Sequence, residues 1–261
     1  MPLTLPEPIT DALRSSPLKL VVCQVRIEES PSIADPRVGL EVFERLGGRA
    51  GRYPLFEPFK GEQIAIRLGP NLPMSAEQTS LNGWRAMSED RNWIVALLPG
   101  SVALETKTYT TWDDDFLPRM TAILDVVGQT LRPAIQMRIG LRYVDLITRP
   151  AVDSPSDWQG WIRDELLGPI LHPAIGLGVL STQQQMDIDA GSGIRCTLRH
   201  GAVPADAGGG LGYLLDWDVY QEEVRAFDAL AIHEWLVGSH RLVLQLFQQA
   251  ITPQLLDAMR S

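Results

Sequence analysis

Two arginines at alternate positions of one segment are the cationic groups best placed for chemistry in this chain. Residues 138–145 (RIGLRYVD) have the periodicity of a strand, which puts Arg138 and Arg142 on one face and apolar residues on the other. A guanidinium group binds carboxylates and phosphates through two parallel hydrogen bonds. Gly140 lies between the arginines and leaves room for another backbone or a ligand. We therefore expect an internal strand with a cationic face.

A second segment carries the matching acidic groups. Residues 215–220 (LDWDVY) place Asp216, Asp218 and Tyr220 on one face of another expected strand. If the two polar faces meet, the charges satisfy one another in an ion-pair network, as charges on a half-buried sheet face require. We expect this structural network. The alternative is that one or both arginines bind an anionic ligand.

Metal and cofactor chemistry find little support in the sequence. The histidines are dispersed, and His233 and His240 are two helical turns apart, too far for one shared metal. His233-Glu234 resembles the start of a zinc-protease helix, but Val237 occupies the position of the second histidine. We expect no metal site and no cofactor.

The sequence gives equally weak support to nucleotide binding and to nucleophilic catalysis. The segment Ala207–Gly212 is glycine-rich but leads into a strand and lacks the Gly-Lys-Ser/Thr ending of a phosphate loop, so we expect a hairpin connection. No Gly-x-Ser-x-Gly elbow is present. No residue is assigned a catalytic role on this basis.

Composition narrows the class of protein. Hydrophobic residues make up 45% of the chain and charged residues 21%, which is enough apolar surface for a folded core. The net charge of −9 makes nucleic acid an unlikely direct partner, because phosphate binding needs clustered cations. Cys23 and Cys196 lie in apolar strand-like runs and are expected to be reduced. No signal peptide or membrane span is expected, which favours the cytoplasm and no membrane partner.

The expected elements form two fused halves. Residues 1–152 form an N-terminal half with a helix near 113–131, and residues 153–261 form a C-terminal half with three strands and a helix near 227–250. Strand follows strand along much of the chain, which indicates antiparallel pairing. The fold class is therefore α+β: a large twisted antiparallel sheet with helices packed on one face, the halves sharing one core. The expected strands lie near 18–27, 53–59, 63–68, 83–88, 93–98, 102–109, 138–145, 180–189, 194–200 and 212–221, and shorter helices near 36–46 and 158–167.

Several landmarks together resemble a sporadically distributed prokaryotic family of uncharacterised proteins. They are the RIGLRYVD strand at 138–145, the LDWDVY segment at 215–220, and His240 followed by Phe247 and Ile251-Thr252. The resemblance implies a compact α+β protein. The patchy distribution of such proteins suggests an accessory role in a prokaryotic defence or toxin–antitoxin cassette, by analogy alone.

We accordingly expect a non-enzymatic interaction or ligand-binding protein, because a sheet with one face covered by helices leaves the other face open. The partner would be a protein or a small anionic ligand, and a homo-oligomer is compatible with the sequence. The alternative is an enzyme with a dispersed polar site on the open sheet face. A desolvated carboxylate beside unpaired polar groups would favour the enzyme.

Overall fold

The structure is a computed structural model that describes residues 3–69, 72–150, 152–205 and 210–261. Its strands are β1 (Leu18–Ile27), β2 (Leu55–Gly69), β3 (Leu72–Met87), β4 (Trp93–Leu98), β5 (Ser101–Thr106), β6 (Ile135–Thr148), β7 (Gln184–Gly191), β8 (Ile194–Pro204) and β9 (Leu211–Ala226). Its helices are α1 (Pro36–Arg45), α2 (Leu117–Thr130), α3 (Asp164–Leu167), α4 (Ala229–Ala250) and α5 (Pro253–Arg260).

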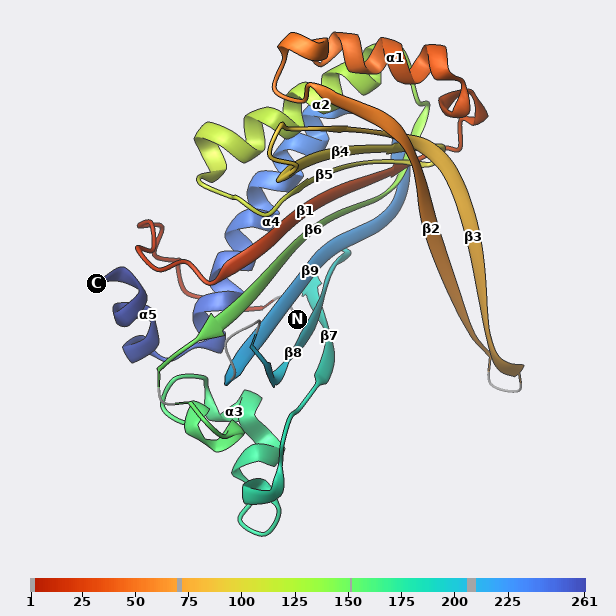
Figure 1. Cartoon of the computed structure of the whole chain (residues 1–261). Coiled ribbons are helices and arrows are strands. Elements are labelled where there is room, and N and C mark those ends of the chain that lie inside the picture. The colour runs from red at the N-terminus through yellow and green to blue at the C-terminus, as the bar shows by residue number, and fades with distance from the viewer. Residues whose placement is uncertain (1–2, 70–71, 151, 206–209) are drawn as a thin grey trace. The chain divides into compact units, whose positions relative to one another are not determined.

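The strands form one 9-stranded sheet in the order β2-β3-β4-β5-β1-β6-β9-β8-β7 (Figure 1). Neighbours that follow each other in sequence pair antiparallel, as in β4 with β5 and β8 with β9. The central pair β1 and β6 is antiparallel too, because Leu146 N donates to Pro17 O at one end and Glu28 N donates to Ile135 O at the other. The predicted α+β class with a large antiparallel sheet is confirmed.

The chain divides into two compact units that are discontinuous in sequence. Unit 1 comprises residues 1–22, 140–222 and 230–261, and unit 2 comprises residues 23–139 and 223–229. The sequence suggested contiguous halves that meet at residue 153. The units do not follow that division, because β1, β6 and β9 each contribute residues to both units. A contiguous cut cannot separate such strands.

In unit 2, α1 and α2 form as their sequence patterns predict. Asp35 caps α1 by accepting a hydrogen bond from Arg37 N at 2.9 Å, and Pro36 occupies the first helical position. The backbone of α1 approaches Trp84 of β3 so closely that a Cβ atom at Gly39 would lie 2.5 Å from the indole ring. Helical spacing predicts an apolar stripe of Phe116, Met120, Ile123, Leu124, Val127 and Leu131. All of these are buried except Leu131, which is half-buried, and Leu117 is buried as well.

The apolar residues of the segment near 227–250 predict a core helix, and α4 of unit 1 is one. Its buried stripe comprises Ile232, Leu236, Ser239, Val243, Leu246, Phe247 and Ala250. Of the six residues that carry the prediction, Leu246 and Phe247 are buried, Phe227, Trp235 and Leu242 are half-buried, and Leu230 is 67% exposed. It lies in the first turn of α4, two positions before Ile232, and so on another side of the helix. The expected helix near 158–167 is shorter than predicted: a 3-10 turn covers Pro155–Trp158 and α3 covers only Asp164–Leu167.

The β2–β3 hairpin is longer than its sequence suggests. Two expected strands near 53–59 and 63–68 are one strand, β2, and β3 begins at Leu72 rather than near 83. β2 pairs along its length with β3, whereas β3 pairs with β4 only through Trp84–Met87. Most of the hairpin is therefore held by its own backbone pairing, which overrides the glycine and polar residues that interrupt the apolar alternation.

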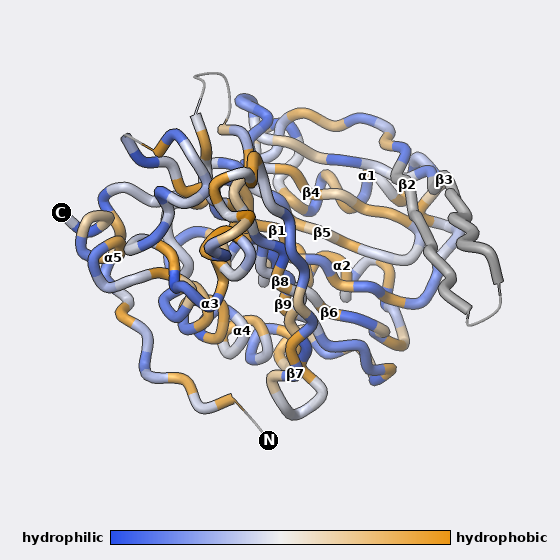
Figure 2. The backbone as a smooth tube through the Cα atoms, turned by 90° about the horizontal axis from the view of Figure 1, so that it is seen from below, coloured by the Kyte–Doolittle hydropathy of each residue, from blue (hydrophilic) through white to orange (hydrophobic). Residues whose placement is uncertain are grey.

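Residues 3–16 form no regular element and run along α4 and α5 in unit 1 (Figure 2). The Gln248 side-chain amide accepts from Ile9 N at 3.0 Å and donates to Ile9 O at 2.7 Å. Gln245 donates to Pro6 O at 2.8 Å, and Ser15 N donates to Met259 O at 3.1 Å. Side chains of the segment contribute as well, because Glu7 pairs with Arg241, Asp11 pairs with Arg260, and Arg14 donates to Ser261 O.

Three further predictions can be compared with the structure. Cys23 and Cys196 are free and buried, as predicted. β8 and β9 are joined as a hairpin, with Ala205 N donating to Gly210 O at 3.0 Å, while residues 206–209 of the glycine-rich segment lie outside the described residues. Within the described ranges, no helix combines the length and the apolar character needed to cross a membrane.

Candidate functional site

The candidate site lies on one face of strands β6, β9, β8 and β7 in unit 1. In the β8–β9 pair, Arg199 is directly opposite Asp216, and Thr197 is opposite Asp218. In the β7–β8 pair, Asp187 is opposite Thr197. Directly opposed residues of antiparallel strands project from the same face of the sheet. The registers therefore gather these polar side chains on one surface.

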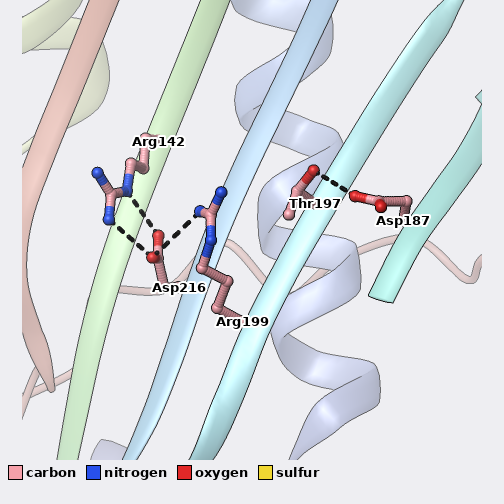
Figure 3. A network of polar contacts seen from close by, with 5 residues as sticks. All are labelled: Arg142, Asp187, Thr197, Arg199 and Asp216. Carbon is pink, nitrogen blue, oxygen red and sulfur yellow. Dashed lines mark hydrogen bonds and ion pairs between the residues drawn. The ribbon is translucent and has the colours of Figure 1, made fainter. Parts of the chain in front are cut away.

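Asp216 is the centre of the site (Figure 3). Arg142 binds it with two parallel hydrogen bonds, Nε to Oδ1 at 2.7 Å and Nη2 to Oδ2 at 2.7 Å. Arg199 reaches the same oxygen from β8, Nη1 to Oδ2 at 3.5 Å. The Asp216 side chain is only 5% exposed, whereas the two arginine side chains are 43% and 44% exposed. A buried carboxylate thus holds two half-exposed guanidinium groups.

The electrostatics of the pair are those of a charge-assisted hydrogen bond. The hydrogen bonds to Asp216 raise the pKa of Arg142, and they outweigh partial burial, which lowers it; the nearby charge of Asp218 adds to the rise. The predicted pairing of Arg142 with an aspartate of residues 215–220 is therefore confirmed, with Asp216 as the partner.

The other predicted site residues are placed as follows. Arg138 lies in the part of β6 that belongs to unit 2. Asp218 stands opposite Thr197, and Tyr220 stands opposite Arg195. Thr197 donates a hydrogen bond to Asp187 on β7 at 2.7 Å, which extends the polar surface by one more strand (Figure 3).

Arg199 is the residue of the candidate site that sequence reasoning missed. It belongs to the expected strand 194–200, whose residues Arg195, Thr197 and Arg199 alternate with Cys196 and Leu198. That alternation was the available signal, because it gives the strand a polar face in the same way as 138–145 and 215–220.

The opposite face of β6 in unit 1 carries buried titratable groups. Tyr143 Oη lies 2.8 Å from Nδ1 of His240 on α4, and burial lowers the pKa of His240 to about 4. Asp145 is buried, and burial raises the pKa of its carboxyl to about 8, with a further contribution from the charge of Asp216. In the described part of the chain, no hydrogen bond or ion pair reaches this carboxyl.

Chemically, the Arg142–Asp216–Arg199 cluster is suited to binding rather than to reaction. Both oxygens of Asp216 are occupied by guanidinium groups, so this carboxylate is poorly placed to take a proton or attack a substrate. Cys196 lies on the neighbouring strand, but burial raises the pKa of its thiol to about 12, which keeps it from acting as a nucleophile.

A metal centre is not apparent either. Among the residues that the structure describes, no three histidine, cysteine, aspartate or glutamate side chains are grouped so that they could hold a metal ion. The expectation that purified protein carries no zinc stays a prediction, which metal analysis after dialysis tests.

The chain was also compared with known proteins. No protein-family model matches it, and no curated protein shows significant sequence similarity to it. The geometry of the Arg142–Asp216–Arg199 cluster is therefore the starting point for a function.

Proposed function

We propose that this chain is a non-enzymatic binding protein whose ligand or partner presents an anionic group, a carboxylate or a phosphate, to Arg142 and Arg199. The observation that carries the proposal is the contrast in burial within the cluster. Asp216 is buried, but the two arginines that it holds are each half-exposed. A purely structural ion pair does not require two cations on one carboxylate.

The hydrogen-bonding capacity of the cluster supports this proposal. A guanidinium group has five N–H donors in a fixed planar arrangement. Arg142 uses Nε and Nη2 for Asp216, and its Nη1 group has no hydrogen-bond partner among the described residues. Arg199 touches Asp216 through Nη1 alone. Both side chains therefore keep donors for an incoming anion.

Preorganisation strengthens the site. Arg142 and Arg199 each approach Oδ2 of Asp216, so their guanidinium groups are held near each other before any ligand arrives. Fixing long side chains in advance reduces the conformational entropy lost on binding.

Anion titration monitored by the arginine Nε–Hε resonances tests the proposal. Inorganic phosphate and succinate serve as separate probes, because they distinguish a phosphate ligand from a carboxylate ligand. We expect one of them to shift the Arg142 and Arg199 signals saturably, and to do so more weakly at high salt.

The matched pair of variants is Arg199→Gln and Arg195→Gln. Both remove one cation from β8, but Arg195 makes no contact with Asp216. We expect Arg199→Gln to abolish the saturable shift and Arg195→Gln to retain it. Equal losses in the two variants, or no saturable shift with either anion, would contradict the proposal.

One observation favours an enzyme as the second candidate. Asp145 is a desolvated carboxyl with a raised pKa, a property that is common among catalytic acids and bases. It is buried, however, and belongs to the set of β6 residues that alternates with Arg142, so it does not project from the same face. Carbodiimide labelling of the folded protein separates the two candidates. The enzyme requires a reagent-accessible Asp145, whereas the binding protein leaves Asp145 unlabelled.

An accessory role in a prokaryotic defence or toxin–antitoxin cassette stays a prediction from the family resemblance. A binding protein of the kind proposed fits such a role, because it acts through a partner rather than through its own chemistry. The identity of the genes beside the coding sequence tests it.

A further inference from the structure

Strand β7 forms one end of the sheet and is a candidate docking site of a different kind. It pairs with β8 on one side, and no strand of the described chain pairs with its other side (Figure 1). An edge strand presents a row of backbone donors and acceptors to which an extended segment can add. β7 has neither lysine nor proline, the residues that commonly block such addition.

The outermost strand of this sheet end carries exposed acidic residues. The row of Arg142, Asp216 and Arg199 ends at the uncharged Gln185 on β7. Further along β7, Asp187 and Asp189 are both exposed. Opposite charges on neighbouring strands stabilise pairing, and like charges destabilise it. A strand added beside Asp187 and Asp189 would therefore carry lysine or arginine.

The segment that leads into β7 exposes large aliphatic side chains. Leu177 is 94% exposed and Leu180 is 85% exposed, and Ile175 is exposed as well. The segment is nevertheless ordered by its backbone, since Gly176 N donates to His172 O at 2.8 Å and Gly178 N donates to Ile175 O at 2.9 Å. Burying such side chains against a partner is favourable, because it removes apolar surface from water. An ordered turn that displays leucine is a preformed apolar anchor.

The position of Gly176 explains why the turn is held in place. A Cβ atom there would lie only 2.1 Å from the carbonyl oxygen of Ile170, so the turn packs backbone to backbone against the preceding 3-10 turn. Leu177 follows directly and is directed to solvent by this packing. The exposed leucines are therefore a fixed part of the surface of unit 1.

The acidic residues near this surface indicate which kind of partner can bind it. An anionic membrane is disfavoured, because no lysine or arginine occurs from Asp164 to Ile194, whereas four acidic residues do. A second copy of the chain is disfavoured too. Antiparallel self-pairing of β7 about Ile188 would put Asp187 opposite Asp189 of the second copy, and pairing about Asp187 would oppose the two copies of that residue.

We propose that the β7 edge and the Ile175–Leu180 turn together bind an extended basic segment of a different protein, which adds to the sheet as a further antiparallel or parallel strand. Its cationic residues would lie beside Asp187 and Asp189, and its apolar residues would cover Leu177 and Leu180. This site shares no residue with the Arg142–Asp216–Arg199 cluster, so the two proposals can be tested independently of each other.

Two synthetic peptides of equal length test the proposal, one alternating lysine with valine and one alternating glutamate with valine. Binding is measured by fluorescence anisotropy, and its location by hydrogen exchange of the β7 backbone amides. We expect the lysine peptide to bind at least about tenfold more tightly, a difference of about 1.4 kcal/mol, and to slow exchange in β7. Equal affinities, or slowed exchange elsewhere but not in β7, would overturn the proposal.

Matched variants of the full chain exclude general attraction to an acidic protein. Asp189→Lys reverses the charge at the edge, and Asp125→Lys makes the same change on the exposed surface of α2. Leu177→Ser removes the apolar anchor, and Leu40→Ser is its control on α1. Only Asp189→Lys and Leu177→Ser should weaken binding of the lysine peptide, again by about tenfold.

The other occupants give distinct results. Sedimentation of the chain alone detects self-association, and a dimer that Leu177→Ser dissociates would show that a second copy occupies the edge. Flotation with phosphatidylcholine vesicles, with and without phosphatidylserine, detects a lipid surface. Either result would replace the proposed protein partner.

Discussion

Two arginine clusters, one in each unit, use the same residue types in opposite ways. In unit 2, Arg119 of α2 pairs with Asp115 at 2.6 Å and lies over the Trp93 ring, 4.1 Å from its centroid. Both charged side chains there are mostly covered, at 16% and 22% exposure. In unit 1, the carboxylate is buried and the arginines are half-exposed. In the first arrangement, the guanidinium group is covered by protein on its face and on its edge. In the second, the guanidinium groups keep N–H donors at the surface.

This difference shows that an ion pair indicates a binding site only when its exposed arginine keeps N–H donors that no protein group accepts. Arg119 is covered by an aromatic ring on its face and by a carboxylate on its edge. Arg142 and Arg199 have no aromatic ring over them among the described contacts. Asp145 extends the series: Asp216 has two cationic partners, Asp115 has one, and Asp145 has none in the described chain.

The largest effect is expected from Arg142→Met, because it leaves the buried Asp216 carboxylate with only the distant contact to Arg199. Stability should fall by about 3 kcal/mol, measured by urea unfolding at neutral pH. The double variant Arg142→Met/Asp216→Leu should regain much of this loss, since it also removes the stranded charge. If Arg142→Met lost less stability than Arg119→Met, the Arg119 cluster would contribute more to stability than the Arg142 cluster, contrary to this prediction.

Asp145 should make stability fall as pH rises. Its pKa of about 8 in the folded protein lies above the ordinary value of 3.8, so the folded state binds an extra proton between these values. Its contribution is full at low pH and is lost as pH rises toward 8. Asp145→Asn should remove this decline, which thermal unfolding at pH 6, 7, 8 and 9 checks.

The buried histidines act with the opposite sign. Burial lowers the pKa of His240 to about 4 and also lowers that of His200, both from 6.5, so the unfolded state binds more protons below pH 6.5. Stability contributed by neutral histidine is lost as pH falls from 6.5. The Asp145→Asn variant should therefore show a clear loss between pH 6.5 and pH 4, which the native chain partly conceals. A flat profile in the variant would show that these groups are not buried as described.

Arg119→Met should have a smaller effect than Arg142→Met. The methionine retains some packing against Trp93, and the partly exposed Asp115 can be solvated, so the expected loss is about 1 kcal/mol. Arg119→Lys helps to separate the causes, because it keeps a charge near Asp115 but loses the planar contact with the ring. Urea unfolding of both variants gives the comparison.

The smallest effect on stability is expected from Arg199→Gln. Its single contact with Asp216 is 3.5 Å long and its side chain is half-exposed, so the loss should be less than about 0.5 kcal/mol. The same variant is expected to abolish anion binding. A loss of stability comparable to that of Arg142→Met would instead make Arg199 a structural partner of Asp216.

The sequence predicted those parts of the molecule in which local pattern and final structure agree. The α2 stripe, the α4 core and the Arg142–Asp216 pair all follow from periodicity of 3.6 or 2 residues, which places side chains on a common face. α5 was missed although Thr252 and Pro253 form the same start signal as Asp35 and Pro36; Thr252 accepts from Leu255 N. That omission could have been avoided.

Other features could not be obtained from local pattern. β3 extends to Leu72 because it pairs with β2, and its residues 73–80 include proline, serine, glutamate and glutamine, which do not alternate as a strand should. The role of Arg199 depends on the register that sets it opposite Asp216, and register is a property of two strands together. Likewise, two units that share three long strands have no boundary at any one residue.

The attachment of residues 3–16 has a consequence for how this part of the chain tolerates mutation. Gln248 and Gln245 bind backbone atoms of Ile9 and Pro6, which any residue type supplies except proline at position 9, where the N–H donor is needed. Outside Glu7, Asp11 and Arg14, whose side chains are also bound, substitutions in this segment should accordingly be accepted more freely than changes in its length. Inserting or deleting one residue between Ile9 and Ser15 would move the amide of Gln248 out of step with the contact between Ser15 and Met259. In related chains, this stretch should diverge in residue identity while keeping a constant number of residues.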